Sequence, residues 1–251
     1  MQPFNDAIAL ITGAASGIGA AVATRLANSG ARKLILVDRD ETRVHDFAFT
    51  LACERAVVVG DVADPALWVE ADLTGLTHAV VNAGIATTGP IESLAFEDWR
   101  RIMAVNLDGA FLSLQAALRA IRSTGAGSIV VTASAAGIKA EQGIAAYAAS
   151  KSALIQLARV AAKEAAPNGI RVNVIAPGGV ETAIWDQVPM FSERAKEVGR
   201  DAAFAEMAAM ATPLKRYAKA EEIAAQIAFL LSDDCATVTG AVFVSDGGYT
   251  L

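Results

Sequence analysis

Residues 7–29 read AIALITGAASGIGAAVATRLANS, and this stretch decides the fold. Its first six residues predict an apolar strand, which runs into a turn containing Gly13, Gly17 and Gly19, where a helical pattern begins. Glycines permit a tight turn and a close approach of the backbone to a pyrophosphate, and a helix N-terminus offers free N–H groups. We therefore predict a phosphate-binding turn, although a plain strand-to-helix turn also uses glycines.

Short β-branched runs alternate with longer helical patterns along the rest of the chain. Most of the runs are apolar throughout, as expected for parallel strands covered on both faces. The predicted strands are Ala7–Thr12, Lys33–Val37, Ala56–Gly60, His78–Val81, Ser128–Thr132, Arg171–Ile175 and Ala241–Val244. The predicted helices include Gly17–Ser29, Phe96–Arg122, Tyr147–Ala166 and Ala220–Leu231.

This alternation predicts an α/β fold, a Rossmann-like doubly wound parallel sheet of about seven strands flanked by helices. The sequence has no linker, repeat or low-complexity block, so we expect a single dinucleotide-binding domain over residues 1–251. The segment Glu181–Tyr217 differs, because its pattern is that of helices and turns without a strand. A long insertion near the strand ends is a candidate substrate lid, which we place at about residues 183–215.

Composition narrows the class of protein. Of the 251 residues, 54% are apolar and 19% are charged, which excludes an intrinsically disordered chain. The net charge of −6 argues against a protein that follows nucleic-acid phosphates. Glycines and hydroxyl residues interrupt the long uncharged stretch Ala7–Thr24, so we expect neither a membrane span nor a targeting segment.

Cysteines and histidines are few. Cys53 and Cys235 are far apart in the sequence and form no paired framework, which favours the reducing cytoplasm as the compartment. His45 and His78 lack the spacing of metal ligands. We therefore predict ordinary solvated or half-buried histidines and no metal site.

An acidic residue ends the second predicted strand and bears on the choice of cofactor. The carboxylate of Asp38 can accept hydrogen bonds from both hydroxyls of an adenosine ribose, and its charge would repel a 2′-phosphate. The neighbouring Arg39 is a competing signal, because an arginine there can hold a 2′-phosphate. Since the glycine-rich turn carries no basic residue, the balance favours NAD over NADP. The alternative for Asp38 is a helix N-cap.

Tyr147 and Lys151 are four residues apart at the start of a predicted helix and therefore share one face. A free tyrosine has a pKa of about 10, but an adjacent ammonium and a cationic nicotinamide ring both favour the phenolate. Ser134 follows a buried strand and is a candidate hydrogen-bond partner for a substrate oxygen. Alone, the tyrosine–lysine pair is weak evidence, and a turn serine is the ordinary interpretation of Ser134.

With these residues the chain resembles the short-chain dehydrogenase/reductases of similar length over essentially its whole extent. Any one motif is weak evidence, but seven motifs in this order and spacing are strong evidence. One departure is Val81, where many relatives have a second asparagine, and we expect this change to affect strand packing more than chemistry. The matching motifs are Thr12-Gly13-x-x-x-Gly17-Ile18-Gly19, Asp61-Val62, Asn82-Ala83-Gly84, Asn106, Ser134, Tyr147-x-x-x-Lys151 and Pro177-Gly178-x-x-x-Thr182.

The resemblance implies catalytic roles for Asn106, Ser134, Tyr147 and Lys151. Tyr147 would be the general acid/base that exchanges a proton with the alcohol or carbonyl oxygen, and Lys151 would lower its pKa and bind the nicotinamide ribose. Ser134 would orient and polarise the substrate oxygen. Asn106 would help to hold a water that relays protons outward.

The resemblance also implies a cofactor-binding set. Asp61 and Val62 would flank the adenine, and residues 82–84 would line the cofactor near its ribose. Val180 and Thr182 would hold the nicotinamide carboxamide. The whole predicted set is Gly13, Ser16, Gly17, Ile18, Gly19, Asp38, Arg39, Asp61, Val62, Asn82, Ala83, Gly84, Tyr147, Lys151, Pro177, Gly178, Val180 and Thr182.

Three segments are expected to frame the substrate pocket: Ile85–Ile91, Ala135–Ile144 and Ala183–Met210. The last contains large apolar residues, which suggest a largely apolar alcohol or ketone as substrate, although ordinary helix packing also explains them. These residues are Ile184, Trp185, Val188, Met190 and Phe191. In the second segment we expect Lys139, Glu141 and Gln142 to be solvated, with Gln142 the candidate for a polar contact with substrate.

The expected activity is hydride transfer between NAD and a secondary alcohol or ketone. If the protein is an oxidoreductase, the alternative activity is that of an NADP-dependent 3-oxoacyl-thioester reductase, such as a 3-oxoacyl-[acyl-carrier-protein] reductase. A hypothesis of another class is a non-catalytic nucleotide sensor or scaffold, which predicts a broken catalytic set. The final stretch, Gly240–Tyr249, resembles the segment that relatives bury between subunits, so the resemblance implies a homotetramer. From the net charge and the interrupted apolar stretches we expect no nucleic-acid or membrane partner.

Overall fold

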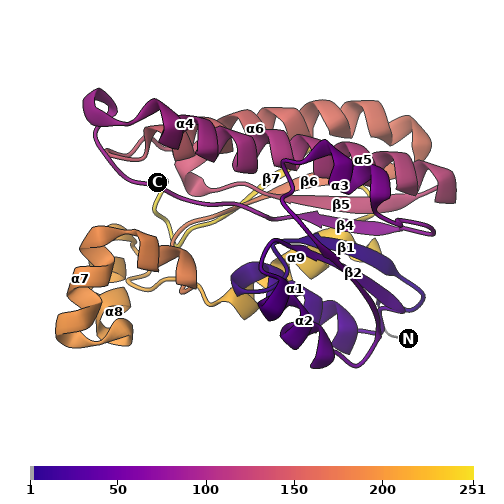
Figure 1. Ribbon diagram of the computed structural model, residues 1–251, viewed down its shortest axis with the longest axis horizontal. Helices are drawn as coiled ribbons and strands as arrows, with labels where there is room; N and C mark the ends of the chain where they lie inside the picture. Colours follow the sequence, from indigo (N-terminus) through magenta and orange to yellow (C-terminus); the bar gives the residue numbers. More distant parts are fainter. Residues whose placement is uncertain (1–2) are drawn as a thin grey trace.

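Seven parallel strands form one sheet in the computed structural model, which describes residues 3–251 (Figure 1). The strands are β1 (Ile8–Thr12), β2 (Lys33–Asp38), β3 (Glu54–Val59), β4 (His78–Val81), β5 (Gly127–Thr132), β6 (Ile170–Pro177) and β7 (Val242–Ser245). Their order is β3-β2-β1-β4-β5-β6-β7, so the winding reverses between β1 and β4. The predicted fold class is confirmed, and the predicted strand ends differ from these by at most two residues.

Helices cover both faces of the sheet (Figure 1). One face carries α1 (Gly17–Asn28), α2 (Glu41–Phe49) and α9 (Ala220–Leu231). The other face carries α3 (Pro65–Glu70), α4 (Phe96–Met103), α5 (Ala110–Thr124) and α6 (Ala145–Ala165). Among residues 3–251, no helix combines the length and the apolar character that a bilayer crossing requires.

Neighbouring side chains of β1 belong to different hydrophobic cores. Ile11 lies in the core that includes Leu26 of α1, whereas Leu10 lies in the core that includes Leu114 of α5. Both β1 side chains are fully buried. This double burial explains why the strand is apolar at every position, since a strand with one solvated face would alternate apolar and polar residues.

The predicted helix Phe96–Arg122 is helical along its whole length, but its middle is not regular α-helix. A π-helical segment, Ala104–Gly109, separates α4 from α5. Single π-helical turns inside longer helices are often found at functional sites. This one contains Asn106, whose side chain is fully buried.

The segment between β6 and α9 consists of helices and turns, as predicted. The 3₁₀ turn Ala183–Gln187 is followed by α7 (Pro189–Val198) and α8 (Arg200–Ala211), which lie apart from the two helical layers (Figure 1). An aromatic cluster of Trp185, Phe191, Phe204 and Tyr217 gives this segment a core of its own. The Trp185 ring stacks on Tyr217 with a centroid distance of 5.3 Å.

His78, at the start of β4, is a packed structural histidine. Its ring meets Phe4 edge-on at a centroid distance of 5.6 Å, and its Nδ1 lies 2.8 Å from the Thr77 hydroxyl. Burial, together with the charge of Arg171, lowers the pKa of His78 to about 4. The ring therefore stays neutral in the folded protein down to a pH of about 4, whereas in the unfolded chain it binds a proton below a pH of about 6.5.

We expect His78 to make the protein sensitive to mild acid. Between pH 6.5 and about 4 the unfolded chain binds a proton at this site and the folded chain does not, so stability falls as the pH falls through this window. The free energy of unfolding is lower by about 3 kcal/mol at a pH of about 4 than at neutral pH. Urea unfolding of wild type and His78→Asn at several pH values measures it. A parallel pH dependence in the two proteins would contradict the assignment.

Candidate active site

A cleft of about 1180 Å³ runs along the carboxyl ends of the strands. Ligands of open α/β sheets bind at this edge, next to the point where the strand order reverses. The first six strands each contribute a residue at or just beyond their carboxyl ends. From β1 to β6, these residues are Gly13, Asp38, Gly60, Asn82, Thr132 and Pro177.

The glycine-rich turn forms one wall of the cleft. Gly13 and Gly17 have φ angles of 66° and 54°, in the left-handed region that favours glycine. Gly19 is required for a different reason, because a Cβ at this position would lie 2.0 Å from the carbonyl oxygen of Gly13. Within residues 3–251, the Ser16 side chain makes no capping hydrogen bond, so the first N–H groups of α1 are left for a ligand.

Asn82 and Thr12 join β4 to β1 beside this turn. The buried Thr12 hydroxyl accepts hydrogen bonds from the backbone N–H groups of Asn82 and Ala83 at 2.9 and 3.0 Å. The Asn82 side chain donates to the Thr12 carbonyl at 3.1 Å. Asn82, Ala83 and Gly84, predicted to line the cofactor, lie along the cleft, and Asn82 also supports the glycine-rich turn.

Asp38 lies at the cleft with its carboxylate held by backbone groups. Oδ2 accepts from the N–H of Ala15 at 2.9 Å, and Oδ1 accepts from the N–H of Asp40 at 3.1 Å. The N-cap alternative for Asp38 was wrong, because Asp40 caps α2 by accepting from the N–H of Arg43. Arg39 and Arg43 also line this end of the cleft, and Arg43 forms an ion pair with Asp40.

Asp61 and Val62 line the same end of the cleft. The Asp61 carboxylate accepts from the N–H of Ala63 at 2.9 Å, which orders the turn after β3. Val62 is buried and packs against the π-helical segment, because a Cβ on Gly109 would lie 2.6 Å from its side chain. This pair therefore presents one carboxylate and one apolar surface to the cleft.

At the other end of the cleft, α6 brings Tyr147 and Lys151 next to Ser134. The Lys151 ammonium donates to the Thr132 carbonyl at 3.0 Å and lies 5.7 Å from the centre of the Tyr147 ring. Burial lowers the pKa of Lys151 to about 8. Burial raises the pKa of Tyr147, and a hydrogen bond with Ser134 opposes this rise.

Ser134 is positioned by the backbone around it. Its hydroxyl accepts from the N–H of Ala136 at 3.1 Å and lies 3.4 Å from the Pro177 carbonyl. Asn106 is near the same site but does not line the cleft. Its side chain holds both backbone groups of Ile85, accepting at 2.8 Å and donating at 2.9 Å.

Residues 177–182 form another wall of the cleft, which is lined by Pro177, Gly178, Val180 and Thr182 of the predicted cofactor-binding set. A Cβ on Gly17 would lie 3.3 Å from the Thr182 methyl, so this methyl lies beside the glycine-rich turn. A Cβ on Gly179 would overlap the Tyr217 ring, which packs directly on the backbone there. Of the predicted site residues, only Gly19 and Asn106 lie behind the lining within the described chain.

Large apolar side chains line part of the cleft. Ile184, Trp185, Val188 and Met190 line it, as do Met207 and Met210 of α8. Phe191 does not line it, because its side chain is fully buried in the aromatic cluster. Four of the five apolar residues predicted to reach the pocket therefore do so, and ordinary packing explains the fifth.

Sequence reasoning missed Tyr249, near the C-terminus. Its hydroxyl donates to Glu141 at 2.5 Å, its carbonyl accepts from Lys139 at 2.6 Å, and all three residues line the cleft. Lys139 and Glu141 are exposed, as predicted, but they also anchor the C-terminal residues at the mouth of the cleft. In the sequence, the aromatic residue itself was the one sign of this role, because the residues that Tyr249 contacts lie more than 100 positions earlier in the chain.

The residues present fit a nicotinamide dinucleotide. A Cβ on Gly13 would lie 3.0 Å from the Ala83 backbone, and one on Gly17 would lie 3.3 Å from the Thr182 methyl. Both positions therefore suit glycine, the residue that lets a turn backbone approach a pyrophosphate closely. Asp38 and the Tyr147–Lys151 pair lie at opposite ends of one continuous cleft. In addition, the buried Thr132 hydroxyl, which lines the cleft, has no hydrogen-bond partner within residues 3–251.

Comparison with known proteins agrees with this geometry. A family model described as enoyl-(acyl carrier protein) reductase matches residues 13–250. Levodione reductase of Leifsonia aquatica is 38% identical, with 98% of this chain and 94% of that protein covered. Cyclohexanol dehydrogenase of Acinetobacter sp. (strain SE19) is 37% identical, with coverages of 98% and 96%. The crystal structure of levodione reductase superposes with a TM-score of 0.90 at 36% identity, covering 98% of both chains.

Proposed function

The chain belongs to the short-chain dehydrogenase/reductase family, and we propose that it is an NAD-dependent oxidoreductase acting on a secondary alcohol or ketone. One observation carries the proposal. Tyr147, Lys151 and Ser134 lie in the same cleft as the glycine-rich turn and Asp38. A group that can exchange a proton therefore faces the end of the cleft at which a dinucleotide bound by the turn would present its nicotinamide.

In this proposal Tyr147 exchanges the proton with the substrate oxygen. The bound nicotinamide supplies the hydride chemistry and a positive charge in its oxidised form. Burial raises the pKa of Tyr147, so the phenolate needs nearby positive charge, which the Lys151 ammonium provides. Ser134 donates a hydrogen bond to the substrate oxygen, which keeps that oxygen within reach of Tyr147.

Lys151 and Asn106 have supporting roles in the proposal. Lys151 binds the nicotinamide ribose in addition to stabilising the phenolate. A Cβ on Gly84 would lie 3.3 Å from the Lys151 ammonium and 3.4 Å from the Asn106 side-chain oxygen, so both groups lie beside Gly84, just after β4. This closeness supports a role for Asn106 in holding a water that carries the proton away from Lys151.

We propose that the protein prefers NAD to NADP as its cofactor. The Asp38 carboxylate would accept hydrogen bonds from the adenosine ribose and repel a 2′-phosphate. The two arginines at this end of the cleft, which would favour the 2′-phosphate of NADP, are the weaker signal. Arg43 is paired with Asp40, and Arg39 is exposed. The adenine would lie between the apolar surface of Val62 and the side chain of Asp61.

We expect wild type to bind NADH at least about tenfold more tightly than NADPH, a ratio worth about 1.4 kcal/mol. Asp38→Ser should reverse this preference, because the repulsion is removed and Arg39 remains. Calorimetric dissociation constants for both cofactors measure it. The ratio is the useful quantity, since loosening the turn through Ala15 would weaken both cofactors alike. Tighter NADPH binding by wild type would contradict the assignment.

The proposed substrate is a largely apolar secondary alcohol or its ketone. Support comes from the apolar lining of Ile184, Trp185, Val188 and Met190, which belong to the segment that we propose as the lid. Two relatives are named for cyclohexanol and levodione, so cyclic alcohols and ketones are the first compounds to test.

A panel of alcohols with NAD, and of ketones with NADH, tests the activity by the absorbance of the reduced nicotinamide. Turnover of secondary alcohols supports the proposal. Turnover confined to 3-oxoacyl thioesters with NADPH would favour the reductase alternative. The absence of turnover with every compound, despite cofactor binding, would favour a non-catalytic nucleotide sensor.

We propose a homotetramer in the cytoplasm. Phe243 and Val244 of β7 are 38% and 42% exposed, an unusual exposure for apolar side chains of a sheet strand, which supports a subunit contact at this edge. Cys53 and Cys235 are free thiols, which suits a reducing compartment. Light scattering on the purified protein measures the assembly.

A further inference from the structure

Residues 179–182 connect the cofactor cleft to the α7–α8 segment. On the cleft side, the Thr182 methyl lies beside the glycine-rich turn, 3.3 Å from the place where a Cβ on Gly17 would be. On the other side, two carbonyls of the same stretch accept hydrogen bonds, one from the 3₁₀ turn Ala183–Gln187 and one from α8. The Trp185 indole donates to the Val180 carbonyl at 2.9 Å, and Arg200 donates to the Thr182 carbonyl at 2.8 Å.

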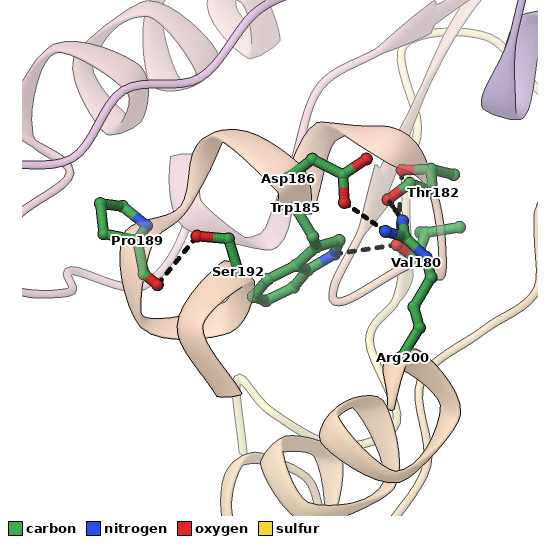
Figure 2. A network of polar contacts seen from close by, with 7 residues as sticks. All are labelled: Val180, Thr182, Trp185, Asp186, Pro189, Ser192 and Arg200. Atoms are coloured by element: carbon green, nitrogen blue, oxygen red, sulfur yellow. Dashed lines mark hydrogen bonds and ion pairs between the residues drawn. The ribbon is translucent and has the colours of Figure 1, made fainter. Parts of the chain in front are cut away.

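Figure 2 shows Arg200 at the start of α8, extending toward Thr182. Its guanidinium also pairs with Asp186 of the 3₁₀ turn. The guanidinium carbon lies over the Phe191 and Phe204 rings, 5.3 and 5.1 Å from their centroids. One side chain therefore contacts α7, α8, the turn between β6 and α7, and the backbone of Thr182.

These contacts require arginine specifically. A planar guanidinium can stack on rings while its two terminal nitrogens donate in different directions, whereas a lysine ammonium is a single point charge. The position of Arg200 also costs helix stability, because a cation at the first residue of a helix faces the positive end of the dipole. Helix stability thus does not explain the residue, but its contact with Thr182 does.

We propose that Arg200 is a positioning residue that holds Thr182 in place for the nicotinamide end of the cofactor. This inference rests on the proposed NAD-dependent function. Arg200 acts through the Thr182 backbone and contacts no reacting group. Its loss should therefore weaken the interactions made by the nicotinamide half of the cofactor and leave those of the adenosine half unchanged.

The test compares NADH with ADP-ribose, which lacks the nicotinamide. Calorimetric dissociation constants are measured for both ligands with wild type, Arg200→Ala and Arg200→Lys. Arg200→Ala should weaken NADH binding at least about tenfold, the scale of one lost charged hydrogen bond. ADP-ribose binding should be unchanged. Arg200→Lys should behave like Arg200→Ala, because its charge is retained but the fork to Thr182 and Asp186 is lost.

Arg194→Ala is the matched control. Arg194 pairs with Glu197 and Glu206 in the same two helices, so its removal also breaks ion pairs there, but those partners lie away from residues 179–182. Both ligands should bind this variant as they bind wild type. Equal weakening of NADH and ADP-ribose in the Arg200 variants, no weakening in either, or the same NADH defect in Arg194→Ala would overturn the inference.

The outcomes also separate this inference from the proposed function. If wild type binds neither NADH nor ADP-ribose, the proposed function and the role of Arg200 both fail. If wild type binds both ligands and the Arg200 variants do not discriminate between them, only the role of Arg200 fails. Should Arg200→Ala not fold, Arg200→Lys provides the same comparison with the charge beside Asp186 retained.

Discussion

Tyr147→Phe is expected to reduce turnover by about a thousandfold and to leave the dissociation constant for NADH almost unchanged. General acid–base catalysis typically contributes about 10²–10⁴-fold, and phenylalanine removes the one hydroxyl assigned to proton exchange. The ring itself stays in place, so the packing of α6 against the cleft is retained. The measurement pairs steady-state kinetics with calorimetric cofactor binding.

Ser134→Ala is the comparison variant for Tyr147→Phe, because it removes a hydroxyl that orients the substrate and not the one that exchanges the proton. Ser134 orients the substrate oxygen in the proposal, so its loss should raise KM or lower kcat without abolishing proton exchange. A Tyr147→Phe protein that retains wild-type turnover would contradict the mechanism. Equal loss of activity and of NADH binding would instead indicate a structural role for the Tyr147 hydroxyl.

Gly19→Ala is expected to abolish measurable NADH binding and to destabilise the fold. A Cβ at this position would lie 2.0 Å from the Gly13 carbonyl oxygen and 3.0 Å from the Asn82 side chain, so the turn and the first turn of α1 must separate. The misplaced N–H groups no longer converge on a pyrophosphate. Overpacking of this kind costs about 1–3 kcal/mol, which urea unfolding can measure.

Thr24→Ala provides the control in the same helix, because Thr24 is exposed and lies five residues beyond Gly19. It should unfold and bind NADH like wild type. Normal NADH affinity in Gly19→Ala would contradict the assignment of residues 13–19 as the pyrophosphate site, even if the variant were less stable.

Features that depend on neighbouring residues could be predicted from the sequence. The strand, glycines and helix of residues 7–29 follow one another directly, so local physics determines their arrangement. The Tyr147–Lys151 pair is equally local, since residues four apart on a helix share one face. Parallel topology then brings the strand ends, and with them Asp38 and Ser134, to one edge of the sheet.

Features that depend on distant contacts could not be predicted. The π-helical turn at Asn106 interrupts a run whose sequence pattern is helical throughout, because its geometry depends on burial against Ile85 and Ser150. Tyr249 reaches the cleft only through Lys139 and Glu141. Arg200 resembles any surface arginine in the sequence, and only the folded chain brings it to Thr182.

The most direct test of the central claim follows a labelled hydrogen atom. A secondary alcohol that the panel identifies as a substrate is prepared with deuterium on its carbinol carbon and incubated with NAD and the protein. Mass spectrometry of the cofactor should find the deuterium in the reduced nicotinamide with wild type and find almost none with Tyr147→Phe. Reduced cofactor without deuterium, or equal transfer by the two proteins, would contradict hydride transfer assisted by Tyr147.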